Sequence, residues 1–130
     1  MEKKILIAED DEFLRELYAD ILKGEGYRIT TAIDGEDALQ KLSQGGWDLV
    51  LLDIIMPKLS GLEVAKKAKE LPQPAIPNKS IIFLTNLDKG EEIKEALILG
   101  TGYLIKSQIT PGDLVKEVKL YLEQPPAPAS

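Results

Sequence analysis

Five short apolar runs alternate along the chain with longer segments whose apolar residues recur at helical spacing. The runs occupy residues 4–8, 27–32, 48–53, 80–85 and 103–106. In the third run four consecutive apolar residues, 49–52, precede an aspartate, a pattern that is typical of a parallel strand buried on both faces. This alternation predicts five βα units, and therefore an α/β fold with helices on both faces of a parallel sheet.

Capping residues indicate where several helices begin. Asp11 and Ser60 precede the first and third helical segments, and Thr110-Pro111 begins the last one. The second and fourth helices are expected over residues 34–43 and 89–99. The apolar faces expected for the first, third and last helices are Phe13, Leu14, Leu17, Tyr18, Ile21 and Leu22; Leu62, Ala65, Ala68 and Leu71; and Leu114, Val115, Val118, Tyr121 and Leu122.

The length of 130 residues suits one domain with its own core, which we expect to span residues 1–123. Residues 124–130, QPPAPAS, contain little that can pack or pair, so we expect a flexible Pro/Ala-rich tail or the start of a linker. Three prolines between residues 72 and 77 predict a loop before the fourth strand.

Composition excludes several kinds of chemistry. The chain has neither Cys nor His, which excludes disulfides, thiol catalysis and phosphohistidine, and any bound metal should be a hard cation held by oxygen. The net charge of −6 lacks the basic footprint of direct nucleic-acid binding. No apolar run can span a membrane, and the apolar stretch at residues 5–8 is too short for the pattern of a signal peptide, so we expect no membrane contact and a cytoplasmic location.

Charged and hydroxyl side chains lie at the carboxyl ends of four of the predicted strands, at the edge where parallel sheets carry their chemistry. They are Glu9, Asp10 and Asp11 directly after the first strand, and Asp53, Thr85 and Lys106 as the last residues of the third, fourth and fifth strands. We predict a flavodoxin-like, doubly wound sheet of five parallel strands in the order 2-1-3-4-5, with five helices. In that order the first and third strands are neighbours, so Asp10 and Asp53 should converge.

Carboxylates this close repel one another, and a Mg²⁺ ion together with Lys106 would offset their charge. A carboxylate can attack phosphorus to form an aspartyl phosphate, whose oxygens need a cation, an ammonium and a hydroxyl donor. Mg²⁺, Lys106 and Thr85 provide that set. Singly, residues 9–12 are explained as a helix start, Asp53 as a turn cap and Thr85 as a strand former. Their joint arrangement at one sheet edge favours phosphoryl chemistry.

The predicted strand ends lie in five sequence motifs. These are ILIAEDD (5–11), YRITTAIDGEDAL (27–39), LVLLDIIMPKLSGLE (49–63), IIFLT (81–85) and GYLIK (102–106). With these motifs, and above all the pattern D-x-x-M-P-x-x-x-G from Asp53 to Gly61, the chain resembles the receiver domain of two-component response regulators. The resemblance covers about residues 3–123. Within the family, the chain is most similar to stand-alone receivers that resemble chemotaxis regulators.

The resemblance implies a role for each candidate residue. Asp53 is the phosphoacceptor, Thr85 hydrogen-bonds the phosphoryl group, and Lys106 pairs with it. Glu9 binds the metal directly or through water. The implied Mg²⁺ ligands are the carboxylates of Glu9, Asp10 and Asp53 and the backbone carbonyl of Ile55.

The resemblance also implies a phosphorelay switch and partners. Tyr103 turns inward when Thr85 moves, which reshapes the face of the fourth helix, fifth strand and last helix where partners read the state. The implied donor is a histidine kinase, a phosphotransfer protein or a small phosphodonor, and the receiver signals to an unknown downstream protein. We expect a monomer or weak dimer that assists its own phosphorylation and dephosphorylation but is not an enzyme with a separate substrate.

Four departures from the family pattern remain. Ser107 replaces a common proline, and Asn86 replaces a small residue, which would narrow access to Asp53. Residues 100–103 are one residue shorter than the common form, and the loop at 72–79 is longer. None of the departures removes a chemical group. The alternative of a pseudo-receiver, an interaction module that is not phosphorylated, rests on Asn86 and Ser107.

Other classes fit less well. A haloacid-dehalogenase-type phosphatase needs a second aspartate two positions after the nucleophile, where this chain has Ile55. The P-loop of an NTPase is absent. A flavodoxin needs a phosphate-binding loop after the first strand, and here that loop is acidic.

Overall fold

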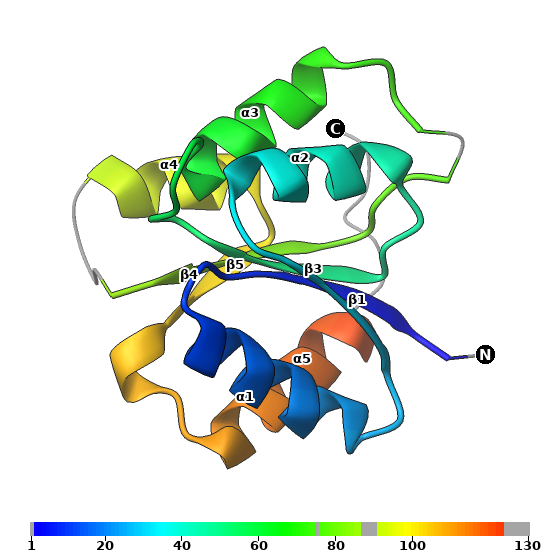
Figure 1. The fold of residues 1–130 in the computed structure, drawn as a ribbon, viewed down its shortest axis with the longest axis vertical. Helices are drawn as coiled ribbons and strands as arrows, with labels where there is room; N and C mark the ends of the chain where they lie inside the picture. The colour runs from blue at the N-terminus through cyan, green and yellow to red at the C-terminus, as the bar shows by residue number, and fades with distance from the viewer. Residues whose placement is uncertain (1, 75, 87–90, 124–130) are drawn as a thin grey trace.

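A five-stranded parallel sheet forms the centre of the computed structural model, with helices on both of its faces (Figure 1). The structure describes residues 2–74, 76–86 and 91–123. The elements are β1 (Lys4–Ala8), α1 (Glu12–Lys23), β2 (Arg28–Ala32), α2 (Gly35–Gln44), β3 (Leu49–Asp53), α3 (Gly61–Glu70), β4 (Ile81–Thr85), α4 (Glu91–Leu99), β5 (Gly102–Ile105), the 3-10 turn η1 (Lys106–Gln108) and α5 (Pro111–Glu123). The strand order is β2-β1-β3-β4-β5, which confirms the predicted fold class and order.

The continuous apolar run in β3 is buried on both faces of the sheet, as predicted. Val50 and Leu52 pack in the core layer shared with α2, α3 and α4. Leu49 and Leu51 point the other way, into the layer shared with α1 and α5. Since successive strand residues face opposite sides, a central strand covered by helices on both faces needs apolar residues at every position.

Two of the predicted helix caps can be seen directly. The side chain of Asp11 accepts a hydrogen bond from the backbone N–H of Leu14 at the start of α1. At the start of α3, Ser60 accepts from the N–H of Glu63, and the Glu63 side chain accepts from the N–H of Ser60. This reciprocal capping box satisfies two backbone donors that have no partner inside the helix.

Part of the predicted apolar faces is wrong. Phe13 is 73% exposed and Leu17 is 37% exposed, because the buried stripe of α1 is narrow and consists of Tyr18, Ala19 and Leu22. Leu71 is 40% exposed, since α3 ends at Glu70 and Leu71 has an extended backbone beyond the helix.

One predicted strand is shifted by one residue in the structure, and two predicted segments lie outside the described residues, in part or completely. The fifth strand was expected over residues 103–106, but β5 is Gly102–Ile105 and Lys106 begins the turn η1 instead of ending the strand. Residues 89–90 of the predicted fourth helix and the predicted tail at 124–130 lie outside the described residues.

The glycine that begins β5 is explained by the packing of α5. A Cβ atom at Gly102 would lie 2.5 Å from the hydroxyl oxygen of Tyr121 on α5. One residue earlier, the N–H of Thr101 donates to the carbonyl of Ile81, 2.7 Å away, and its hydroxyl accepts from the N–H of Ile81. Residues 100–103 therefore tie β4 to β5 and α5 despite their short length.

Trp47 anchors the proline-containing loop at the edge of the sheet where β3 begins. It is 5% exposed, and its indole N–H donates to the carbonyl of Lys41, 2.9 Å away. Its backbone N–H donates to the side-chain oxygen of Asn78, whose amide nitrogen donates to the carbonyl of Leu42. The ammonium of Lys4 lies 4.8 Å from the centre of the indole ring.

Among the described residues, no helix combines the length and the apolar character that are needed to cross a bilayer.

Candidate functional site

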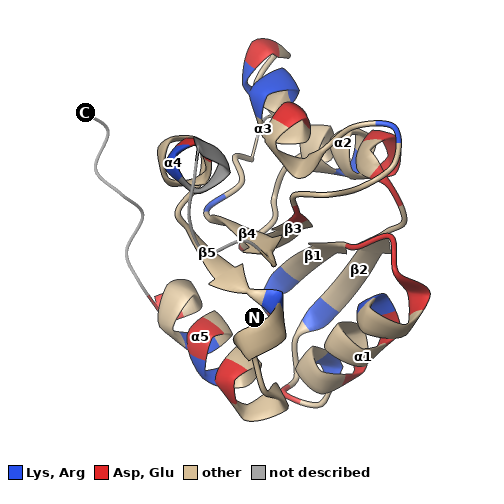
Figure 2. Cartoon of the chain, turned by 90° about the vertical axis from the view of Figure 1, so that its left-hand side faces the viewer, with Lys and Arg blue, Asp and Glu red and all other residues tan. Residues whose placement is uncertain are grey.

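Three carboxylates from two neighbouring strands meet at the carboxyl edge of the sheet. β1 pairs with β3 so that Ala8 lies opposite Leu52, and the residues that follow these two are therefore neighbours. Glu9, Asp10 and Asp53 each offer a carboxylate oxygen, and these oxygens all lie within 4.8 Å of one another. The predicted convergence of the first and third strand ends is confirmed. In Figure 2 the segment after β1 is an acidic band at one end of the sheet.

An open cavity of about 320 Å³ covers this group of carboxylates. Thr85, Asn86 and Lys106 form its wall on the side of β4 and β5, and Ile55 closes it on the side of β3. All of the residues predicted for the site therefore line one cavity, except Tyr103.

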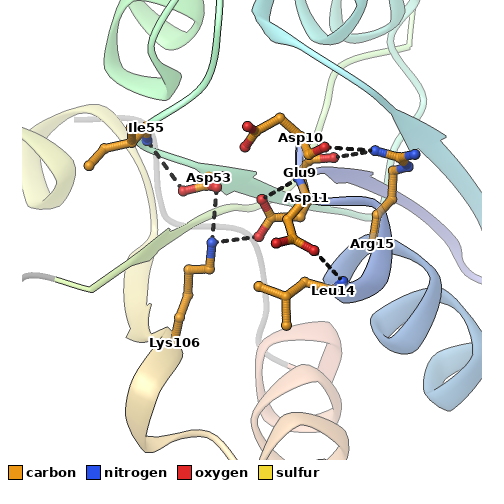
Figure 3. A network of polar contacts seen from close by, with 8 residues as sticks. All are labelled: Glu9, Asp10, Asp11, Leu14, Arg15, Asp53, Ile55 and Lys106. Carbon is orange, nitrogen blue, oxygen red and sulfur yellow. Dashed lines mark hydrogen bonds and ion pairs between the residues drawn. The ribbon is translucent and has the colours of Figure 1, made fainter.

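The ammonium of Lys106 bridges two of the carboxylates (Figure 3). Its Nζ atom lies 2.6 Å from Oε1 of Glu9 and 3.0 Å from Oδ2 of Asp53. The side chains are 12% exposed for Lys106, 0% for Glu9 and 6% for Asp53, so both ion pairs are shielded from water. The contact with Asp53 is also a hydrogen bond, and the contact with Glu9 is the shorter of the two ion pairs.

Burial and like charges shape the titration of the site. Burial raises the pKa of the Glu9 carboxyl, and Asp53 adds to this effect while Lys106 opposes it. Burial also raises the pKa of Asp10, with a further contribution from Glu9. Burial by itself would lower the pKa of Lys106, but the contacts with Glu9 and Asp53 outweigh it and raise that pKa. Each shift indicates excess negative charge in a partly dry cavity.

The donor set fits a hard divalent cation. Oxygen atoms of carboxylates are the preferred protein ligands of Mg²⁺, and this cluster offers three of them to one ammonium. Oε2 of Glu9 accepts from the backbone N–H of Asp11 at 3.3 Å, and the buried Oε1 pairs with the ammonium of Lys106 at 2.6 Å. A single ammonium balances only part of the negative charge of three carboxylates this close together, which is consistent with a site for a cation.

The loop after β3 is held in place by backbone contacts and by Lys58. The N–H of Ile55 donates to Oδ1 of Asp53 at 3.2 Å, and the N–H of Gly61 donates to the carbonyl of Ile54. A Cβ atom at Gly61 would overlap the carbonyl oxygen of Asp53, which explains the glycine of the D-x-x-M-P-x-x-x-G pattern. Lys58 has a left-handed backbone, with φ of 72°.

Lys58 connects this loop to the loop before α2. Its Nζ atom lies 3.4 Å from Asp34 and 3.5 Å from Glu36. In the same region the N–H of Gly35 donates to the carbonyl of Pro57. Sequence reasoning did not identify Lys58, because a lysine beside a proline carries no signal for a positive φ.

The predicted switch residues lie on adjacent strands, two positions apart in the register. Thr85 ends β4, is 2% exposed and lies opposite Ile105 in the strand pairing. Tyr103 is half-buried on β5 and packs against the core layer of α2, α3 and α4. It also lines a second cavity between β5 and α5. The coupling of these two residues stays a prediction.

Arg15 is a residue of the site that the sequence analysis missed. From the first turn of α1, its Nη1 atom donates to the backbone carbonyls of Glu9 at 3.0 Å and Asp10 at 3.2 Å (Figure 3). The only sequence signal for this contact is an arginine four residues after the helix cap Asp11. That spacing is too common to predict a contact with the loop backbone.

The family comparison agrees with this fold and this edge of the sheet. The family model described as "Response regulator receiver domain" matches residues 5–119. The chain therefore belongs to the response regulator receiver domain family, whose members act in two-component signalling.

Individual relatives include both regulators and chemotaxis proteins. The chain is 34% identical over 123 residues to the transcriptional regulatory protein DltR of Streptococcus agalactiae, covering 93% of this chain and 52% of that protein. It is 35% identical over 107 residues to the chemotaxis protein CheY of Treponema pallidum, covering 79% and 72%. The chain spans about half the length of the first curated relatives that it matches.

Solved structures agree with the fold. A CheY-like receiver domain from Methanospirillum hungatei superposes with a TM-score of 0.82 at 30% identity, covering 95% of both chains. The chemotaxis protein CheY4 of Vibrio cholerae gives a TM-score of 0.80 at 29% identity, covering 93% of this chain and 99% of that one.

Proposed function

We propose that this chain is a phosphorylation-switched receiver whose Asp53 accepts a phosphoryl group in the presence of Mg²⁺. The observation that carries the proposal is the position of the Lys106 ammonium between Glu9 and Asp53, over an open cavity at the carboxyl end of β3. The membership of the receiver family supports it.

The proposed step is a transfer of the phosphoryl group to a carboxylate oxygen of Asp53. A P–O bond forms to that oxygen, and the bond from phosphorus to the donor breaks, with its electron pair leaving on the donor's nitrogen or oxygen. Lys106 already contacts Asp53, so an ammonium is in place to stabilise the phosphoryl oxygens. The hydroxyl of Thr85, at the end of the adjacent strand, is the proposed hydrogen-bond donor.

Glu9, Asp10 and Asp53, with the carbonyl of Ile55, are the proposed metal ligands. When bound, Mg²⁺ neutralises part of the charge that develops on the phosphoryl oxygens. Asp53 is the last residue of the rigid strand β3, and Glu9 and Asp10 directly follow the end of β1. The chain's role is to bind and orient; it assists its own modification without a separate substrate.

The proposed donor is a histidine kinase, a phosphotransfer protein or a small phosphodonor, because the chain itself contains no histidine. The proposed output surface is the face of α4, β5 and α5, which a downstream protein would read through Thr85 and Tyr103. Leu97 and Ile98 on α4 are 57% and 76% exposed and give this face apolar contacts. The net charge of −6 favours a protein partner over nucleic acid.

The alternative is a pseudo-receiver that binds partners without being phosphorylated. Asn86, exposed on the cavity wall, is the observation that favours it, because a larger side chain there narrows access to Asp53. We prefer the phosphorylated receiver because every group that the transfer needs lines one cavity.

Intact-protein mass spectrometry tests the proposal. The protein is incubated with acetyl phosphate or phosphoramidate, with and without Mg²⁺, beside Asp53→Asn and the matched control Asp20→Asn, whose side chain is exposed on α1. We expect one phosphoryl adduct that requires Mg²⁺, persists in Asp20→Asn and is lost in Asp53→Asn. No adduct with either donor, together with no binding of beryllofluoride, would establish the pseudo-receiver instead.

A further inference from the structure

Arg15 makes two hydrogen bonds to the backbone that carries the acidic pair. Its side chain is half-buried beside the loop between β1 and α1. One nitrogen, Nη1, donates to the carbonyl oxygens of Glu9 and Asp10, which are consecutive residues (Figure 3). Arg15 approaches this loop from α1, whereas Lys106 enters between the carboxylates of Glu9 and Asp53.

The contact matters because the sheet ends where the acidic pair begins. The N–H of Glu9 still pairs with the carbonyl of Ala32, but β1 itself stops at Ala8. The carbonyls of Glu9 and Asp10 lie beyond the strand ladder, and the structure shows the guanidinium of Arg15 as their donor. Hydrogen bonds from a charged donor are the stronger class of such contacts.

The remaining contacts tie the same loop to α1 through the acidic residues themselves. The carboxylate of Asp11 caps the N–H of Leu14 at 3.0 Å, and the N–H of Asp11 donates to Oε2 of Glu9. A variant that removes one of these two hydrogen bonds would change an acidic side chain of the site or a residue bonded directly to one. Arg15 fixes the loop through main-chain oxygens and touches no carboxylate in these two bonds, so its contribution can be removed while every proposed metal ligand stays intact.

We infer that Arg15 is a positioning residue, which fixes the backbone of Glu9 and Asp10 so that their carboxylates are pre-arranged for a divalent cation. The inference rests on the proposed function for the identity of the cation. Groups that orient metal ligands without binding the metal typically change affinity by about 10- to 100-fold when removed. We expect about a tenfold loss of Mg²⁺ affinity without Arg15.

A charge effect of Arg15 would act in the opposite direction. A positive charge near the site repels a cation, so deleting that charge alone would strengthen Mg²⁺ binding. The sign of the change therefore separates positioning from electrostatics.

The test is the affinity of the unphosphorylated protein for Mn²⁺, measured by electron paramagnetic resonance, and for Mg²⁺, measured by competition. Arg15→Met removes the donors and keeps the length of the side chain. Arg15→Lys keeps an ammonium with three protons, enough for both carbonyls, and should recover part of the affinity. Arg28→Met is the matched control, because Arg28 is exposed at the opposite end of β2 and carries the same charge.

A second measurement shows whether the loop itself has loosened. We expect faster hydrogen exchange at the N–H of Asp11 in Arg15→Met, with the exchange of β3 amides unchanged, which also shows that the variant is folded. Phosphorylation by acetyl phosphate should be slower than in the parent at low Mg²⁺ and equal to it at saturating Mg²⁺, since the loss is one of metal affinity.

Each outcome decides the inference. Weaker binding in Arg15→Met, partial recovery in Arg15→Lys and no change in Arg28→Met would support it. Equal or tighter binding in Arg15→Met would overturn it and leave the proposed function standing. A parent protein that binds neither Mn²⁺ nor Mg²⁺ would overturn it together with the metal of the proposed function.

Discussion

Replacing Lys106 with methionine removes the ammonium that bridges Glu9 and Asp53 and keeps a side chain of similar length. Both carboxylates are almost completely buried, so water solvates them poorly once the ammonium is removed. Removing one partner of a buried ion pair typically costs roughly 3–5 kcal/mol. Because Lys106 itself is 12% exposed, we expect a value at the lower end, about 3 kcal/mol at about pH 7.5 without divalent cations.

The stability lost in Lys106→Met cannot exceed the cost of protonating Glu9, because a neutral Glu9 no longer needs the ammonium. The ordinary pKa of a glutamate is 4.5, so forced protonation at about pH 7.5 costs about 4 kcal/mol, since each pH unit is worth about 1.4 kcal/mol. At about pH 6 the same limit is about 2 kcal/mol. The destabilisation of Lys106→Met must therefore become smaller as the pH falls, because a neutral Glu9 no longer repels Asp53.

Urea unfolding at the two pH values measures both quantities. Lys119→Met is the matched control, because Lys119 is 51% exposed and pairs with Glu25 at 3.1 Å, so its loss should change the unfolding free energy by less than about 1 kcal/mol. A loss in Lys106→Met that is equal at both pH values would refute the reasoning, since it would come from packing and not from uncompensated charge. A loss as small as that of the control would refute it as well.

Two further predictions follow from the same region. Because the pKa of Glu9 is raised, the folded protein binds this proton more tightly than the unfolded chain, and Glu9 lowers stability as the pH rises above 4.5. In urea titrations, Glu9→Gln should therefore flatten the dependence of the unfolding free energy on pH. An unchanged slope would show that Glu9 does not cause this dependence. Gly61→Ala should lower the unfolding free energy by about 1–3 kcal/mol, because its Cβ overlaps the carbonyl of Asp53. Gly112→Ala, with its nearest neighbour 3.9 Å away, should stay within about 1 kcal/mol, and equal losses in the two variants would rule out the steric cause.

Much of the fold and the position of the site were predictable from the sequence. The run at 49–52 specifies a strand buried on both faces, because only helices on both sides of the sheet can cover apolar residues at every position. Once that strand is central, the parallel topology brings the end of β1 beside the end of β3, and Glu9, Asp10 and Asp53 must meet. The chemical roles of these residues remain predictions.

The errors and omissions concern features that depend on tertiary packing. Phe13 and Leu17 have the spacing of an apolar face, but the width of the buried stripe on α1 depends on how closely the sheet and α5 cover it. The left-handed backbone of Lys58 is stabilised by contacts with another loop, and no local pattern indicates it. The contact of Arg15 with two carbonyls requires the exact direction of the chain after β1, which sequence periodicity does not define.

The location of Trp47 determines what fluorescence can report on this protein. It is the single tryptophan of the chain and lies six residues before Asp53, at the opposite end of β3. At about 3.3 Å per strand residue, the indole is about 20 Å from the acidic site. Its emission depends on the packing of the loop at residues 72–79 and on Lys4, so it records unfolding. Tryptophan emission therefore measures the stability of the Lys106 and Gly61 variants independently of metal binding, and a lack of response to Mg²⁺ carries no information about the carboxylates.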